Sequence, residues 1–161
     1  MFKKTISAAL LATSLASMGG ISAHAANQAA TQSCMPIGGV AQPNFVPEDD
    51  GTFTVVAPLY GSVAVAAGTI LNSRETATGL EMDMTHYFMN DKGGFMHTKD
   101  LAILTPVPGK ANHYMIEVTY HIQEATTSGV LKGYKGQFQS WGLVNLKDNK
   151  GLIRYKGEIC K

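Results

Sequence analysis

The sequence has little charge, and its positive and negative charges nearly balance. Its 13 basic and 12 acidic residues give a formal net charge of +1. Proteins that hold nucleic acid or an anionic membrane surface usually carry an excess of Lys and Arg, because the partner is a dense array of negative charge. We therefore expect no nucleic-acid partner for this chain.

Long hydrophobic runs are also missing, since none reaches the roughly 20 residues of a membrane-spanning helix. The most apolar stretch, residues 6–15, follows Lys3 and Lys4 and precedes Ala23-His24-Ala25. A basic start, a short apolar segment and an A-x-A site are typical of a secretory signal peptide. We predict a signal peptide over residues 1–25. The remaining 136 of 161 residues would form one soluble domain, periplasmic or secreted, without stable membrane insertion.

Cysteine is nearly absent, because the chain has only Cys34 and Cys160. An even number of cysteines in an exported protein usually means a disulfide. Two thiols alone make a poor zinc site, since structural zinc takes four ligands. We predict a Cys34–Cys160 disulfide that ties the start of the mature chain to its end. Paired in this way, neither sulfur is a catalytic nucleophile.

Helical periodicity is lacking after residue 25. Segments rich in Val, Thr and Ile, often with alternating apolar and polar side chains, predict strands instead. They cover residues 52–57, 62–71, 80–89, 95–104, 113–123, 130–144 and 152–160. Residues 26–50 contain three prolines, and we expect them to form an extended N-terminal arm before a domain at residues 51–161.

About eight strands separated by short turns predict an all-β fold, a single small antiparallel β-barrel. Gly133, Gly136 and Gly142 interrupt one of the strand segments, and such glycines often mark bends where a sheet curls. Closing the sheet removes its exposed edges and makes the first and last strands neighbours, which fits the predicted disulfide. A β-sandwich is the alternative.

The segment Gly133-Tyr134-Lys135-Gly136-Gln137-Phe138, followed by a glycine-rich hairpin, resembles the small eight-stranded barrels of the lipocalin and allene oxide cyclase kind. The resemblance is one of layout and covers about the last third of the chain. It implies a barrel. It implies no catalytic residue, because no motif of either family is matched residue by residue.

Met82-x-Met84-x-His86 is the sharpest cluster of potential metal ligands. Alternate residues of a strand point to one face, with neighbours roughly 7 Å apart. Thioether and imidazole groups suit Cu(I) in exported proteins. Further soft ligands lie across the predicted hairpin: Met89, Met96 and His97. One hypothesis is a periplasmic copper-binding protein using Met82, Met84 and His86. The other interpretation is an apolar core face, since Met fills irregular cores well.

Residues 113–123 alternate strictly and predict a half-buried strand. His113, Glu117 and His121 share one face, but its two histidines lie roughly 27 Å apart along a strand and cannot form one site. If this face lines a polar cavity, Glu117 or His121 would be a general acid or base of an isomerase or cyclase. The other interpretation is a solvent-facing polar surface.

Aromatic residues are the remaining candidates for a site. Together with Glu117 and His121, the candidates for lining a small-molecule cavity are Tyr114, Tyr120, Tyr134, Phe138 and Trp141. No Ser-His-Asp, Cys-His or phosphate-binding-loop motif is evident. Our leading hypothesis is therefore an exported barrel that binds a small, largely apolar molecule without catalysis and without a cofactor. A protein-interaction module, such as an inhibitor of an envelope enzyme, is a further alternative.

Overall fold

The computed structural model describes residues 32–50 and 52–161. The predicted signal peptide, residues 1–25, lies outside the described residues. The strands are β1 (Cys34–Ala41), β2 (Asn44–Pro47), β3 (Phe53–Gly61), β4 (Val65–Thr76), β5 (Gly79–Met89), β6 (Phe95–Pro106), β7 (His113–Ile122), β8 (Gln137–Asn145) and β9 (Lys150–Cys160). Two short 3-10 helices, η1 (Glu124–Thr126) and η2 (Gly129–Leu131), lie between β7 and β8. The all-β prediction is confirmed.

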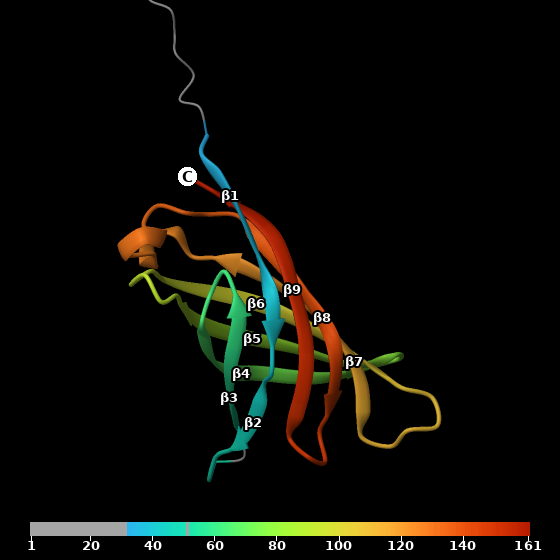
Figure 1. The fold of residues 1–161 in the computed structure, drawn as a ribbon. Coiled ribbons are helices and arrows are strands. Elements are labelled where there is room, and N and C mark those ends of the chain that lie inside the picture. The colour runs from blue at the N-terminus through green and yellow to red at the C-terminus, as the bar shows by residue number, and fades with distance from the viewer. Residues whose placement is uncertain (1–31, 51) are drawn as a thin grey trace, which may run out of the picture. The chain divides into compact units, whose positions relative to one another are not determined.

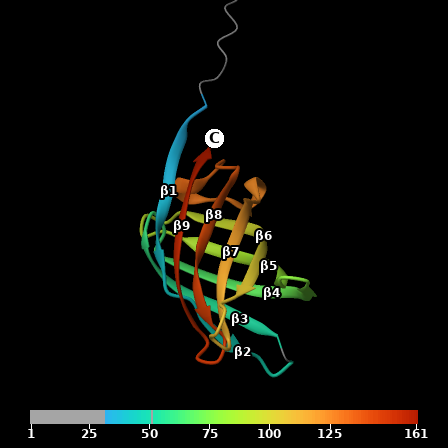
Figure 2. The same ribbon diagram turned by 90° about the vertical axis from the view of Figure 1, so that its right-hand side faces the viewer.

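The strands form a closed antiparallel β-barrel of eight positions (Figures 1 and 2). From β3 to β9, each strand pairs with the next one along the chain. β1 and β2 follow one another in the remaining gap, where both pair with β3 and with β9. The predicted barrel is therefore confirmed, and the β-sandwich alternative is wrong.

The boundary predicted at residue 51 needs correction. Residues 34–47, expected in an arm that precedes the barrel, form β1 and β2 and close it. Proline and glycine made this stretch look like a connecting segment, whereas Pro43 only separates the two strands. Gly39 of β1 lies opposite Gly61 of β3, and a Cβ on either would be 2.7 Å from the hydroxyl of Tyr155. The glycines thus allow the strands and this buried tyrosine to meet closely.

The strand predicted at residues 130–144 is also shorter than expected. Residues 129–131 form η2, and β8 begins only at Gln137. Gly133 and Gly136 have φ values of +80° and +106° in the connection before it. These conformations suit glycine and interrupt the extended backbone, so the strand cannot include them.

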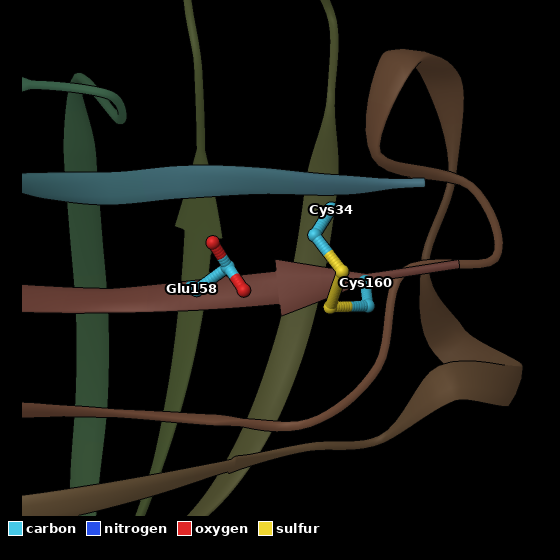
Figure 3. A group of neighbouring side chains, drawn as sticks. All are labelled: Cys34, Glu158 and Cys160. Atoms are coloured by element: carbon cyan, nitrogen blue, oxygen red, sulfur yellow. A yellow bond between two sulfur atoms is a disulfide. The ribbon is translucent and has the colours of Figure 1, made fainter. Parts of the chain in front are cut away.

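The disulfide joins the two strands that close the barrel. Cys34 at the start of β1 lies directly opposite Cys160 at the end of β9, and the two are bonded, as predicted (Figure 3). Eight consecutive residue pairs link the same strands by register, from Cys34↔Cys160 to Ala41↔Ile153. The covalent bond therefore reinforces one end of an existing ladder.

Inward-facing side chains form the core. On β7 the alternation is as predicted, with Ile116, Val118, Tyr120 and Ile122 buried. The same pattern places Met82, Met84, His86 and Phe88 of β5 inside. In the described part of the chain, no helix is both long and apolar enough to cross a membrane.

Candidate functional site

The barrel interior contains a partly open pocket of about 40 Å³, called the chamber below. Every strand except β6 contributes to its wall. The lining residues are Ala41, Pro43, Phe45, Val55, Ala57, Leu59, Ala66, Met84, His86, Phe88, Ile116, Val118, Tyr120, Phe138, Ser140, Ile153 and Tyr155. Most of this wall is apolar, and its polar side chains are therefore the groups able to orient a ligand.

A histidine–aspartate pair lies at one side of the chamber. The Nδ1–H group of His86 on β5 donates a hydrogen bond of 2.7 Å to Oδ2 of Asp100 on β6. The side chain of His86 is 8% exposed and that of Asp100 is fully buried. A hydrogen bond to Nδ1 fixes the orientation of the ring and leaves Nε2 as the acceptor of the neutral imidazole.

The second polar pair consists of two hydroxyl groups. Those of Tyr120 on β7 and Ser140 on β8 share a hydrogen bond of 3.0 Å inside the barrel. Burial raises the pKa of Tyr120; the hydrogen bond to Ser140 opposes this shift, and the charge of Asp100 adds to it. Tyr120 is therefore a neutral hydroxyl, able to donate or accept, across the physiological pH range.

Strand register brings the two polar pairs together. Asp100 lies opposite Met84 on one side and opposite Tyr120 on the other, so its carboxylate lies between β5 and β7. The rings of His86 and Tyr120 meet edge to face, with centroids 5.4 Å apart. Tyr120 also stacks on Phe138, with centroids 4.6 Å apart. Aromatic packing thus fixes the positions of the imidazole and the phenol beside one another.

Asp100 carries an unsatisfied atom. Its Oδ1 is the only buried side-chain polar atom without a hydrogen-bond partner in residues 32–50 and 52–161. Leaving a buried acceptor unpaired costs about 1–3 kcal/mol. Natural cores keep few such groups, and those they keep often lie at functional sites. This atom is the feature of the interior that packing alone does not explain.

Two of the aromatic candidates line the chamber, namely Tyr120 and Phe138. Tyr134 is buried, but it lies in the connection before β8, under the ammonium group of Lys161. Tyr114 is half-buried near the start of β7 and does not reach the chamber. Trp141 points away from the interior and is 42% exposed.

Glu117 and His121, proposed above as cavity residues, are exposed on the outer face of β7. The alternation of that strand places them outside because Ile116, Val118 and Tyr120 occupy its inner face. They line no part of the chamber, and the acid–base role predicted for them inside the barrel needs correction. The solvent-facing interpretation describes both residues.

The predicted copper ligands all point inward, yet they do not share one cavity. Met84 and His86 line the chamber, whereas Met82 lines a surface groove between the ends of β3, β4 and β5. One nitrogen of His86 is already bonded to Asp100. The chamber thus offers one thioether and one imidazole nitrogen, fewer ligands than the predicted set. Copper binding stays a prediction.

Two important residues of the site did not stand out in the sequence. Asp100 occupies an inward position of β6 between Thr98 and Ala102, and one charge inside an apolar alternation is the signal that identifies it. Gly68 on β4 lies opposite His86, where a Cβ would be 2.7 Å from Nε2. Its role depends on cross-strand register, which no local pattern reveals.

Among the described residues, one further group has metal-ligating atoms close together, namely Cys34, Cys160 and Glu158, within 4.8 Å of one another (Figure 3). Both sulfur atoms are engaged in the disulfide, so no thiolate is present to bind a metal. We assign this group a structural role. No protein-family model, curated protein or solved structure matches the chain.

Proposed function

We propose that this protein is an exported β-barrel that binds one small, largely apolar molecule in its interior. The observation that carries the proposal is the chamber, whose apolar wall is interrupted by the polar groups of His86, Tyr120 and Ser140. Binding sites for small molecules typically combine many apolar contacts with a few fixed polar groups. The ligand would be an apolar body bearing one hydrogen-bonding group.

The size of the chamber limits the ligand. At about 40 Å³ it is much smaller than the roughly 300–1,000 Å³ of pockets for drug-sized molecules. Binding of anything larger than a few heavy atoms requires side chains in the wall to move. Met84 is the wall residue best suited to this, because its unbranched side chain has three rotatable bonds.

Phenol and toluene test the proposal, because they have nearly the same shape and differ in one hydroxyl group. Each is titrated into the isotope-labelled protein, and methyl NMR signals of Val55, Ile116 and Val118 report on the chamber. We expect phenol to bind with at least about tenfold higher affinity than toluene, as measured from the shifts of these signals. The reason is that the free energy of one hydrogen bond in a buried site corresponds to about a tenfold change in affinity.

The matched variant for this experiment is Ser140→Ala, which removes one hydroxyl and keeps the shape of the wall. It should reduce the preference for phenol over toluene without abolishing toluene binding. Thr119→Ala, on the outer-facing side of β7, is the control and should change neither affinity. The proposal fails if neither probe shifts the interior methyl signals, or if both bind equally well to the unmodified protein.

A second candidate function is favoured by one observation, the hydrogen bond from His86 to Asp100. The carboxylate of Asp100 holds one nitrogen of the imidazole ring, and the other nitrogen is left free to take a proton. This arrangement is used for general base catalysis. We infer that Nε2 of His86 takes a proton from a carbon next to a carbonyl group. The hydroxyl of Tyr120 or Ser140 would donate a hydrogen bond to the enolate oxygen. In a substrate with a carbon–carbon double bond on the other side of that carbon, the enolate is conjugated with the double bond, and return of the proton to the far carbon of the double bond completes an isomerisation.

Cyclopentanone in D₂O tests this candidate. Exchange of its α-protons for deuterium, followed by NMR, measures proton abstraction directly and needs no knowledge of the natural substrate. We expect the protein to accelerate exchange, and His86→Gln to reduce the acceleration by about 100-fold or more. Exchange no faster than in buffer, or unchanged in His86→Gln, excludes this catalytic role and leaves the binding proposal standing.

Export is tested by expressing the whole chain in a bacterial host and fractionating the cells. We expect a periplasmic protein whose mass corresponds to residues 26–161 with one disulfide. Replacing Ala23 and Ala25 by larger residues should block processing, since signal peptidase needs small residues at both positions. A full-length cytoplasmic protein with free thiols would contradict this part of the proposal.

A further inference from the structure

The outer face of β6, β7, β8 and β9 carries exposed apolar side chains, several of which register sets next to one another. Figure 2 shows these four strands side by side, in the order β9, β8, β7, β6. The exposed large hydrophobic residues on them are Leu101, Ile103, Met115, Trp141, Leu143 and Leu152. We call this surface the β6–β9 face. Contiguous apolar patches of this kind are uncommon on monomeric proteins and often mark interaction sites.

Register places most of these side chains in two neighbouring rows. One row crosses the strands as Ile103, Glu117, Trp141 and Arg154. The next consists of Thr105, Met115, Leu143 and Leu152. Neighbours in a row are about 5 Å apart, and the rows are separated by two residues along each strand, about 7 Å. Met115, Leu143, Leu152 and Trp141 are therefore close neighbours, whereas Glu117 separates Ile103 from Trp141 within their row.

A groove of about 220 Å³ lies within the β6–β9 face. Leu101, Ile103, Glu117 and Trp141 are among the residues that line it. Trp141 stands on the adjacent strand from Glu117, and its 42% exposure leaves much of the indole in contact with water. Large aromatic side chains that remain half exposed in a groove are typical anchors of protein interfaces.

In the row that contains Trp141, the charges are arranged symmetrically about this residue. Glu117 lies one strand away on β7, and Arg154 lies one strand away on the other side, on β9. Both are exposed, and neither forms an ion pair in the part of the chain that the structure describes. An acid and a base equidistant from a central aromatic residue make the row complementary to its own two-fold copy.

We propose that the β6–β9 face is the interface of a homodimer, with a two-fold axis along β8. A rotation about that axis exchanges the two sides of β8, so Glu117 meets the partner subunit's Arg154 and Arg154 meets the partner subunit's Glu117. The same rotation sets Met115 against the partner subunit's Leu152. Trp141 and Leu143, on β8 itself, meet their own copies. Among the row members on β7, β8 and β9, every pairing is then apolar with apolar or opposite in charge.

Two directions of the two-fold axis are simple to consider, along β8 and across the strands. The axis along β8 pairs the charges of this face better. If the two-fold axis ran across the strands through the Trp141 row, Glu117 would meet the partner subunit's Glu117, and Arg154 its own copy. Like charges that face each other in an interface are strongly unfavourable. The charge pattern therefore selects the axis along β8 as well as the partner.

The proposed dimer interface does not overlap the chamber, so the ligand-binding experiments described above apply to the dimer as well. Alternation along the strands puts Glu117 and Trp141 outside, while Tyr120 and Ser140 of the same strands line the chamber. The interface and the chamber are thus opposite sides of one sheet wall. Failure of the ligand proposal would not affect the dimer proposal, and the reverse is also true.

Sedimentation velocity of the mature, exported protein over a range of concentrations tests the dimer. We expect a species of twice the chain mass. Glu117→Arg should weaken dimerisation by about tenfold or more, because it sets two arginines against each other at both symmetry-related positions. Arg154→Glu should do the same. The double variant Glu117→Arg with Arg154→Glu restores opposite charges across the axis and should return the affinity to within about threefold of the unmodified protein.

Glu75→Arg is the control, because Glu75 is exposed on β4, four barrel positions away from β8. It should leave dimerisation unchanged. Circular dichroism confirms that each variant is folded, which is expected since all of the substituted positions are exposed. A monomer at every concentration overturns the proposal. A dimer unaffected by the single reversals, or not restored by the double variant, overturns it too.

Discussion

Gly68 on β4 lies opposite His86 on β5, and the imidazole ring covers the inner side of the glycine. A Cβ at position 68 would collide with Cδ2 of the ring and lie 2.7 Å from both Nε2 and the carbonyl oxygen of Thr85. The small residue therefore makes room for the ring that donates to Asp100. The geometry of the His86–Asp100 pair therefore depends on the absence of a side chain at Gly68 on the neighbouring strand.

Gly68→Ala should therefore disturb the site without changing the fold. The added methyl group must push the His86 ring aside, and such overpacking costs about 1–3 kcal/mol. We expect a lower free energy of unfolding in urea and a shifted NMR signal of the His86 ring. Ala67→Val, on the exposed side of the same strand, is the matched control and should change stability by less than about 0.5 kcal/mol. An unshifted ring signal in Gly68→Ala would show that the ring is held elsewhere.

The hydrogen bond between His86 and Asp100 predicts unequal effects of single and double substitutions. Asp100→Leu leaves the buried Nδ1–H of His86 without an acceptor and should lower the free energy of unfolding by about 2–3 kcal/mol. The double variant His86→Phe with Asp100→Leu replaces both partners by apolar groups of similar shape. It should recover most of that loss, as measured by urea denaturation.

The double variant also tests whether the pair exists for stability. Buried polar pairs often contribute little to stability relative to apolar replacements, and proteins retain them for specificity or function. If the double variant is as stable as the unmodified protein but loses phenol binding, the pair serves the site. If it is less stable than Asp100→Leu alone, the pair is structural and the catalytic candidate loses its main support.

Local patterns were sufficient to predict the architecture. Strict alternation in residues 113–123 predicted a half-buried strand without deciding which face is buried, and the two cysteines predicted where the barrel closes. The stretch containing Pro36 and Pro43 was misjudged, because its strand pairing is set by β9, more than 100 residues away in sequence. Pairing energy from a distant strand overrides the local preference of proline and glycine for turns.

The site was predicted less well than the fold, for a related physical reason. Glu117 and His121 stood out as ionisable residues, but they are solvated on the outside. Asp100 and Gly68 appeared unremarkable, because their roles arise only when register sets them beside His86. Patterns within one strand do not reveal a site that is assembled from several strands. The exception is Asp100, whose single charge at an inward-facing position can be recognised within its own strand.

Alkaline pH should destabilise the protein through Tyr120. In the unfolded chain a tyrosine loses its proton near pH 10, whereas burial raises the pKa of Tyr120 in the folded barrel. The folded state then binds more protons, so its stability falls as pH increases above about 10, by up to about 1.4 kcal/mol per pH unit. Burial likewise raises the pKa of Tyr155.

Urea denaturation between pH 8 and 12 measures this slope. Tyr120→Phe should be less stable than the unmodified protein near neutral pH, because Ser140 loses its partner, but its stability should fall less steeply above pH 10. Tyr60→Phe, at a position that is 62% exposed, is the control and should preserve the slope. Parallel pH dependence in the unmodified protein and Tyr120→Phe would contradict the predicted effect of burial.

Reduction of the disulfide should loosen one specific part of the barrel. Cys34 and Cys160 are 126 residues apart in sequence, so their bond restricts the unfolded chain strongly and contributes about 5 kcal/mol by the loop-entropy argument. In the folded state, β1 remains paired with β9 by its ladder. The double variant Cys34→Ser with Cys160→Ser should therefore fold, with a markedly lower urea midpoint.

Hydrogen exchange in this variant separates an effect on the folded barrel from one on the unfolded chain. Loss of the covalent link frees the outer end of β1, so amides near Met35 and Ile159 should lose protection first, while those of β5–β7 fall only with global stability. If the whole barrel loses protection equally and the β1 end shows no additional loss, the bond acts through the unfolded chain alone. An unchanged urea midpoint would contradict both effects, because the bond closes nearly the whole described chain into one loop.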